Sequence, residues 1–325
     1  MLDITSGKVD RCKSIIYCSE PRRISLSRWT IMTKVAVIST DDRVYGVNKS
    51  LELLGINPAK GKNIILKPNF NTADPPPAST SMETLKQLII KIKEMGAESI
   101  TIAERCGPAN TEEAFRKKGL YELADELDFS VVNISALPRE GFVMKNPEGS
   151  HWKNGFLFAK IFEEAECVIE TCCLKTHMYG GHFTLSLKNA TALVPREGYG
   201  YMSELHSSPH QRKMIAEINT AYKWDLVIMD GVVSFVDGGP MEGTRKDANV
   251  FVSGIDKIAI DAVGVALLRM LGTTLEVTQG PIHEQEQIAR AIELGIGISS
   301  LGDVEFLTDS PESDEIVEQI RAEFA

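Results

Sequence analysis

The stretch GKNIILKPNFNTADPPPASTSMETLKQLIIKIKEMGAESITIAE (residues 61–104) contains two short apolar runs separated by a proline-rich loop and an amphipathic segment. Each apolar run has the length and composition of a buried strand. The segment at 81–95 begins with a serine cap and an early glutamate, carries apolar residues at helical spacing and closes on a glycine. A strand, a helix and a second strand in succession predict one βαβ unit.

The same alternation continues along the chain in both halves. It predicts an α/β fold with a mainly parallel sheet flanked by helices. We expect residues 32–325 to form a single domain, with a subdivision near 145–155 left open. Further strands are expected at 34–40, 129–135, 167–172, 224–232, 249–254 and within 299–310, and further helices at 46–56, 111–127 and from a cap at Asp256 onward.

Residues 1–31 differ in character from the rest of the chain. They carry six Lys and Arg residues, little periodicity and no continuous apolar core of the kind found in a secretory signal. A basic, Ser-rich organelle-targeting leader is one interpretation. We favour the other, in which an upstream start codon was assigned or the extension is disordered, and the functional domain begins near Met32.

Composition excludes several classes of protein. The net charge of −10 and the absence of long basic blocks argue against nucleic-acid binding. No apolar run reaches the roughly 18–20 residues of a membrane span, so we expect a soluble protein with no membrane partner. The six cysteines form no CxxC pair, which argues against an iron–sulfur cluster and indicates reduced thiols in a cytoplasmic protein.

The stretch CCLKTHMYGGHFTLSLKNA (172–190) gathers two thiols, two lysines and two histidines around a Gly-Gly pair. Lys175 and His177 follow an expected strand, where a lysine can neutralise a phosphate or carboxylate and an imidazole can carry a proton. Lys188 lies in an apolar frame, so its ammonium must be paired or its pKa shifted. We expect the glycines to fold the segment back so that both lysines face one anion.

Polar residues at other strand ends extend this candidate site. Ligands of such sheets bind at the carboxyl ends of the strands. Lys67 and Asn69 follow one strand and Asp230 ends another. Asp261 lies in an apolar run, so we expect it to pair with Lys67, Lys175 or Lys188.

A second pattern is the clustering of histidines. Five of the six lie between residues 151 and 210. Imidazole ligands, with Cys173 as a further thiolate, would suit zinc, nickel or iron. The metal ligands would then be His177, His182, His206 and His210.

Several motifs taken together resemble the family called domain of unknown function 362. They are ILKPN (65–69), LKTH with TLSLKN (174–189), DLVIMDGV (225–232), GGPMEGT (238–244) and SGIDKIAIDAVG (253–264). Members of that family are prokaryotic α/β proteins, some fused to a ferredoxin-like module that this chain lacks. The resemblance implies one shared site formed by Lys67, Asn69, Lys175, His177, Lys188, Asn189, Asp230 and Asp261.

Three functions remain open at this point. The leading hypothesis is an enzyme acting on a small anionic metabolite, in which Lys175 and Lys188 hold the anion, His177 is the general acid or base, and the remaining shared-site residues bind substrate. Proton or group transfer is favoured over hydride transfer, because the glycine spacing matches no dinucleotide fingerprint. The alternatives are a metal-dependent enzyme or metal carrier, with a divalent metal as cofactor, and a non-catalytic binding or assembly protein. A redox partner protein and a homo-oligomer are also left open.

Overall fold

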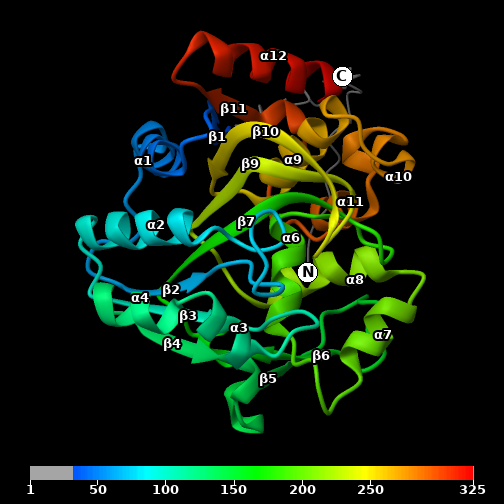
Figure 1. Ribbon diagram of the computed structural model, residues 1–325. Helices are drawn as coiled ribbons and strands as arrows, with labels where there is room; N and C mark the ends of the chain where they lie inside the picture. Colours follow the sequence, from blue (N-terminus) through cyan, green and yellow to red (C-terminus); the bar gives the residue numbers. More distant parts are fainter. Residues whose placement is uncertain (1–31, 325) are drawn as a thin grey trace, which may run out of the picture. The chain divides into compact units, whose positions relative to one another are not determined.

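The computed structural model of the protein describes residues 32–324. The interpretation of residues 1–31 as a leader or extension therefore concerns residues outside this range. Within it, the chain alternates strands and helices, and the prediction of an α/β fold with a mostly parallel sheet is confirmed (Figure 1).

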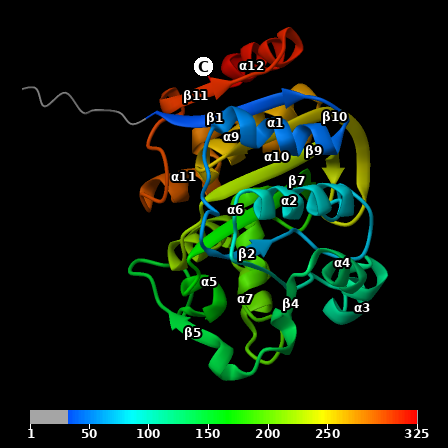
Figure 2. The ribbon, with the colours of Figure 1, turned by 90° about the vertical axis from the view of Figure 1, so that its left-hand side faces the viewer.

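Nine strands of the described chain form one mixed sheet. Eight lie side by side in the order β11-β1-β10-β9-β7-β2-β3-β4, and β8 pairs with β7. Figure 2 shows this order from β11 near the top to β4 near the bottom. The strands are β1 (Thr33–Ser39), β2 (Asn63–Lys67), β3 (Ser99–Glu104), β4 (Ser130–Asn133), β7 (Cys167–His177), β8 (His182–Thr184), β9 (Leu226–Gly238), β10 (Gly243–Gly254) and β11 (Val304–Leu307).

The sheet divides into a parallel part and an antiparallel part. Neighbours from β9 through β7, β2 and β3 to β4 run parallel, as does β11 beside β1. The long β10 runs antiparallel to both β9 and β1. The βαβ unit predicted at residues 61–104 is the pair β2 and β3 joined by α2.

Helices cover both faces of the sheet. In Figure 1, α1 and α2 lie to the left of the sheet and α9 and α11 to its right. The helices are α1 (Arg43–Leu54), α2 (Met82–Glu94), α3 (Thr111–Lys117), α4 (Leu120–Leu127), α5 (Lys160–Glu163), α6 (Ser186–Asn189), α7 (Tyr201–Ser207), α8 (Gln211–Ile218), α9 (Lys257–Met270), α10 (Leu275–Thr278), α11 (Glu286–Glu293) and α12 (Pro311–Phe324).

The alternation of side chains along each strand explains the two hydrophobic layers. In β1, Ala36 and Ile38 pack with α1 and α2, whereas Val35 and Val37 pack with α9 on the other face. The helix α9 is buried along nearly its whole length, and Asp256 caps its first turn by accepting from the Ala259 N–H at 3.0 Å, as predicted.

A third apolar cluster lies beside β2, β3 and β7. It includes residues of the two-stranded sheet formed by β5 (Phe142–Lys145) and β6 (Phe156–Ala159). Residues 145–155, where the sequence left a subdivision open, connect these two strands. A division of the chain there stays a prediction.

Parallel pairing brings the carboxyl ends of β2, β3 and β7 to one edge of the sheet. Lys67 ends β2, Glu104 ends β3, and β7 continues past both to His177. This edge positions the polar residues of the candidate site. No helix among residues 32–324 is both long and apolar enough to cross a bilayer.

Candidate functional site

The stretch from Lys175 to Asn189 folds back on itself. The end of β7 pairs antiparallel with β8, with Lys175 opposite Thr184 and His177 opposite His182. The turn between them contains Gly180 and Gly181, and Gly180 adopts a φ of 78° that favours glycine. The short helix α6 follows β8 and returns Lys188 to the neighbourhood of His177.

Asp261 fixes this short helix to α9. Its carboxylate accepts from the Ser186 N–H at 2.7 Å, the Ser186 hydroxyl at 2.5 Å and the Gln287 amide at 3.2 Å. Burial raises the pKa of Asp261 to about 6. The expectation that Asp261 pairs with Lys67, Lys175 or Lys188 is wrong, because its oxygens are occupied by the start of α6. Asp261 positions α6 and lies outside the cavities.

Two asparagines join two of the predicted lysines. Lys67 Nζ donates to Asn189 Oδ1 at 3.0 Å, and Lys175 Nζ donates to Asn69 Oδ1 at 3.0 Å. The amide of Asn69 reaches Asn189 Oδ1 at 3.3 Å, which completes the chain. Lys67, Asn69, Lys175 and Asn189 are thus brought together at one edge.

Lys67 and Lys175 have different roles in this chain of contacts. Lys67 forms a buried ion pair with Glu104 at 2.8 Å and lines neither of the two cavities described below. Lys175 has only neutral acceptors, namely Asn69 Oδ1 and the backbone carbonyls of Ala78 and Pro240. Lys67 therefore holds Asn189, whereas Lys175 presents a charge to the site.

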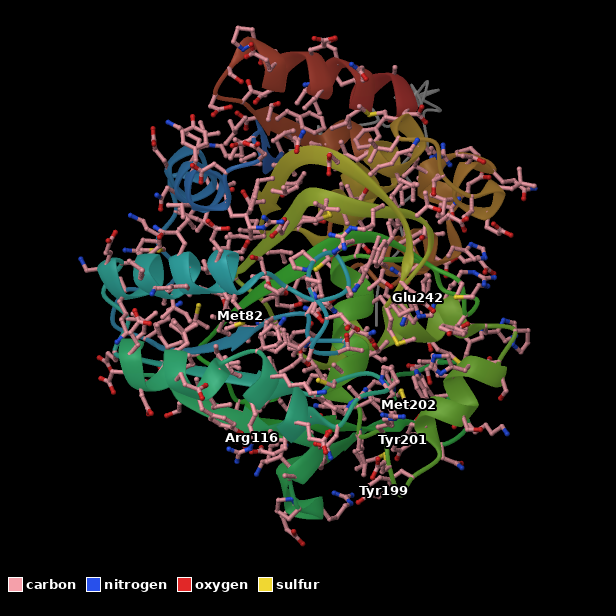
Figure 3. The ribbon with its side chains drawn as sticks, viewed as in Figure 1. Met82, Arg116, Tyr199, Tyr201, Met202 and Glu242 are labelled. Carbon is pink, nitrogen blue, oxygen red and sulfur yellow. The ribbon has the colours of Figure 1, made fainter. Side chains whose placement is uncertain are left out.

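Two cavities meet at this edge. The inner cavity has a volume of about 60 Å³ and the outer cavity about 410 Å³. His177 and Lys188 belong to the walls of both, together with Arg105 and Pro240. The inner cavity is also lined by Asn69, Asn71, Glu104, Lys175, Thr184 and Asn189, and the outer one by Tyr179, Arg196, Met202 and His206. A wall of the outer cavity comes from α7, whose Met202 is labelled in Figure 3.

Positive charge dominates these walls. Arg105, Lys175, Lys188 and Arg196 line the cavities, and the carboxylate among their lining residues is Glu104. That carboxylate is already paired with Lys67 and accepts from two backbone N–H groups. The site therefore has an excess of cations that an anionic ligand would neutralise.

Burial and mutual repulsion disfavour the charged forms of these cations. Burial, followed by the charges of Lys175 and Arg105, lowers the pKa of Lys188 to about 7. Burial lowers the pKa of Lys175 to about 8 and that of Arg105 to about 10. Arg105 is held by the carbonyls of Cys106, Thr191 and Ala192, which leave its charge unneutralised.

Lys188 differs from the other cations in its contacts. The residue is 8% exposed, and its Nζ makes no hydrogen bond or ion pair with any group of residues 32–324. Of the two alternatives that the sequence left open for this lysine, a partner or a shifted pKa, the structure gives the shifted pKa. A lysine buried without such a partner responds by a lowered pKa.

His177 lies beside Lys188. Burial and the nearby Lys188 lower its pKa well below the usual value, so the ring is neutral at pH 7. Its Nδ1 is buried and has no hydrogen-bond partner among the described residues. A neutral imidazole facing a cavity can accept a proton from a bound molecule.

Gly181 allows the two side chains to approach each other. A Cβ at this position would lie 2.7 Å from His177 Nδ1 and 3.1 Å from Lys188 Cε. Both side chains therefore pack against the same bare backbone. The Gly-Gly pair thus serves both as a turn and as a point of close approach.

Asp230 is not part of the site. Its carboxylate accepts from Arg43 Nε of α1 at 2.9 Å and from the Thr84 hydroxyl of α2 at 2.7 Å. It therefore ties two helices to β9 and lines neither cavity. Its side chain points towards α1 and α2, so the structure does not bring Asp230 together with the other predicted site residues, and substrate binding by Asp230 stays a prediction.

The histidines do not form a metal-binding group. Within residues 32–324, no three His, Cys, Asp and Glu side chains lie close enough together to hold a metal ion. His206 faces the outer cavity, and His182 lies in the β7–β8 hairpin. His210 packs against His151 with ring centroids 4.5 Å apart. The geometry thus gives the proposed set of His177, His182, His206 and His210 no support.

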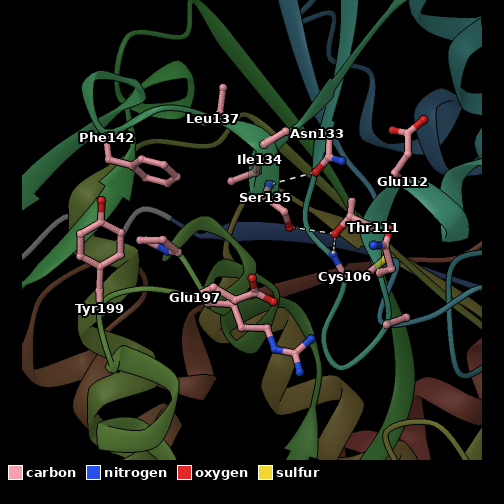
Figure 4. A pocket seen from close by; sticks show the side chains of 15 residues that line it. Cys106, Thr111, Glu112, Asn133, Ile134, Ser135, Leu137, Phe142, Glu197 and Tyr199 are labelled. Carbon is pink, nitrogen blue, oxygen red and sulfur yellow. Dashed lines mark hydrogen bonds between the residues drawn. The ribbon is translucent and has the colours of Figure 1, made fainter.

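A neighbouring cavity of about 320 Å³ lies beyond Arg196. Figure 4 shows Phe142 and Tyr199 on one side of it and Thr111 and Ser135 on the other. Its hydroxyls are engaged with each other, since Thr111 and Ser135 are 2.9 Å apart. Burial raises the pKa of its Cys106 to about 12, which makes that thiol unreactive. It is the weaker candidate because Thr111, Ser135 and Asn133 already have partners and its thiol is unreactive.

Arg105 and Arg196 are site residues that the sequence did not single out for binding. The pair Glu104-Arg105 follows an expected strand, so the signal for Arg105 was present in its position. Arg196 lies in an irregular loop, where no periodicity marks it.

Comparisons with known proteins give two findings. The model of a family described as a domain of unknown function (DUF362) matches residues 64–266, more than half of the chain. The thylakoid-associated protein sll1697 of Synechocystis sp. (strain ATCC 27184 / PCC 6803 / Kazusa) is 23% identical over 219 residues, which is 66% of this chain and 65% of that protein. The chain thus spans slightly less than two thirds of that relative. Every residue that lines the inner or the outer cavity falls inside the family match.

Proposed function

The chain belongs to the family of domain of unknown function 362, and we propose that it is an enzyme that transfers a proton or a group on a small anionic metabolite. One observation carries this proposal. Four cations line two joined cavities whose carboxylate, Glu104, is already paired with Lys67. Such a site is electrostatically incomplete until an anion enters it.

Different residues of the site would bind the anion and move the proton. Lys175 and Arg105 are held in place by neutral carbonyl and amide oxygens, which fix their positive charges at the cavity walls without neutralising them. His177 is neutral and adjacent to Lys188, so its ring can accept a proton from the bound molecule. The inner cavity has room for a carboxylate-sized group and the outer cavity for the rest of a small metabolite.

A non-catalytic binding protein is the remaining alternative. It would need the cations but not a neutral, unpartnered imidazole beside them. The buried Nδ1 of His177 favours the enzyme. A cytoplasmic location, a redox partner and a homo-oligomer stay predictions.

A thermal-shift screen with small carboxylates and phosphate esters tests the proposal. A ligand at about 100 times its dissociation constant stabilises the folded state by about 2.7 kcal/mol. Each hit is then incubated with the protein, and NMR of the mixture monitors exchange of its carbon-bound protons or formation of a product. A panel without any stabilising anion would refute anion binding. Stabilisation without exchange or product would favour the non-catalytic alternative.

A further inference from the structure

Lys188 has a feature that anion binding alone does not use. A lysine that only supplies charge is best held by neutral acceptors, as Lys175 is by three oxygens. Lys188 has none of these, although it is buried and lies in the same pocket. Its amino group is therefore free to approach a bound molecule.

The position of this amino group fits a covalent role. Lys188 borders both cavities, whereas Lys175 borders the inner cavity and Arg196 the outer one. A carboxylate held beside Lys175 and Arg105 would place the adjacent carbon of the ligand near Lys188. The neutral ring of His177 packs against the same face of Gly181 as the lysine stem.

We propose that Lys188 forms an imine with the carbonyl carbon of a small oxo acid whose carboxylate is held by Lys175 and Arg105. This inference rests on the proposed function, because it requires the cations to hold an anion, and it narrows the substrate class to carboxylates that carry a ketone or aldehyde. A lysine reacts in this way when its amine is uncharged at working pH. Burial among cations lowers the pKa of Lys188 to about 7, which leaves a substantial fraction uncharged.

The reaction balances without any oxidant or metal. The lone pair of Nζ adds to the carbonyl carbon, and the carbonyl oxygen takes a proton to give a carbinolamine. Nζ then loses a proton, the hydroxyl takes one and leaves as water, and a C=N bond remains. The protonated imine withdraws electrons from the neighbouring carbon, so a proton or a carboxyl group can be lost from it. Water hydrolyses the imine and restores the lysine.

His177 is the group placed to move these protons. Its Nδ1 has no partner among the described residues and packs against the same bare glycine as Lys188. No carboxylate of residues 32–324 contacts Lys188, so no fixed negative charge holds its proton in place. The arrangement differs in this respect from the buried pair of Lys67 and Glu104.

Reductive trapping tests the inference. The full-length protein is incubated with glyoxylate, pyruvate, oxaloacetate or 2-oxoglutarate in the presence of cyanoborohydride, which reduces an imine to a stable amine. Peptide mass spectrometry then locates the adduct. We expect one adduct per chain, on Lys188, formed at least about tenfold faster than on any exposed lysine, whose amine is almost fully protonated at neutral pH.

Two variants serve as controls. Lys188→Arg keeps a positive charge but has no nucleophilic amine, so we expect the adduct to disappear. Lys60→Arg changes an exposed lysine before the start of β2 and should leave trapping unchanged. Circular dichroism and melting of both variants establish that they are folded.

The outcomes separate this inference from the proposed function. An adduct on Lys188 with any of the four acids supports it. Calorimetric binding of an anion without an adduct on Lys188 overturns the imine and leaves the proposed function standing. Absence of both binding and adduct overturns both proposals. Adducts confined to exposed lysines also overturn the imine.

Discussion

The protein buries two kinds of lysine within one polar interior. Lys67 and Lys257 are fully buried, and each contacts a buried carboxylate, Glu104 at 2.8 Å and Glu170 at 2.7 Å. Lys175 and Lys188 are buried as well, but neither has an ion-pair partner among the described residues. The first pair lines neither the inner nor the outer cavity, whereas both lysines of the second pair line the inner one.

This difference assigns different tasks to the two kinds. A charge that is buried and paired has its desolvation offset by its partner, so it can serve the fold. A charge that is buried and unpaired destabilises the fold, and proteins retain such groups where function needs them. Substituting a paired lysine should therefore change the stability of the fold, whereas substituting an unpaired lysine should change ligand binding.

The largest effect is expected from substituting a lysine that has an ion-pair partner. Lys257→Met leaves Glu170 buried beside Tyr222 without its cation, which should lower the free energy of unfolding by about 3–5 kcal/mol. Urea unfolding measures this change. The control Lys60→Met removes an exposed lysine and should stay within about 0.5 kcal/mol of the parent. An equally small loss in Lys257→Met would show that the ion pair does not support the fold.

The second-largest effect is expected from substituting Lys188, which has no ion-pair partner among the described residues. Lys188→Met keeps the length of the stem and removes the charge, so binding of an anionic ligand should weaken by about 2–5 kcal/mol. Stability should stay equal or rise, because no carboxylate of the described residues loses its partner. Calorimetry and unfolding measured on the same sample test both parts. Parent-like affinity in the variant would remove Lys188 from the site.

The sequence predicted the parallel edge of the sheet, but not which buried lysines have an ion-pair partner and which have none. Strand–helix alternation fixes the parallel edge, and that edge places Lys67, Lys175 and His177 at the ends of the neighbouring strands β2 and β7. The partners of single charges depend on side-chain direction across strands far apart in the chain. Asp230 lies within β9 and not at the strand end expected from the sequence. A strand reverses the direction of its side chains at every residue, so the sequence could not reveal that Asp230 faces α1 and α2.

The unknown direction of side chains also explains the incorrect expectations for Asp261 and the histidine cluster. Asp261 has the apolar neighbours of a residue that needs a cation, but backbone N–H groups of α6 satisfy it instead. The histidine cluster is dense in the sequence, yet its members lie on a hairpin, a helix and a loop, and within residues 32–324 no three His, Cys, Asp or Glu side chains come close enough together to hold a metal ion. Spacing along a chain predicts proximity only within one regular element.

A smaller effect is expected at the glycine between His177 and Lys188. In Gly181→Ala the new methyl would lie 2.7 Å from His177 Nδ1, so one of the two side chains must move. Such overpacking typically costs about 1–3 kcal/mol of stability, and we expect anion binding to weaken by about tenfold. The control Gly302→Ala adds a methyl 3.4 Å from Ser300 Oγ, an ordinary contact. Equal behaviour of the two variants would mean that the close packing at Gly181 does not position the site.

The smallest expected effect is a pH dependence of stability and binding that comes from Lys188, which has no ion-pair partner among the described residues. The folded-state pKa of Lys188 is about 7, below the value near 10.5 of an unfolded chain. Below pH 7 the residue is charged in both states, so the folded state bears the full desolvation penalty. As pH rises from there towards 10.5 the folded state sheds its proton first, the unfolded state binds more protons, and the penalty is lost.

The stability advantage of Lys188→Met over the parent should therefore shrink by about 1 kcal/mol between about pH 6 and about pH 8. Anion affinity of the parent should fall over the same window, because binding needs the charged amine. Unfolding of both proteins at the two pH values, with calorimetry of the parent in buffers of different ionisation enthalpy, measures the stability change and the proton taken up on binding. An advantage that is constant with pH, and binding without proton uptake, would mean that Lys188 is charged in the folded protein and belongs with Lys67 and Lys257.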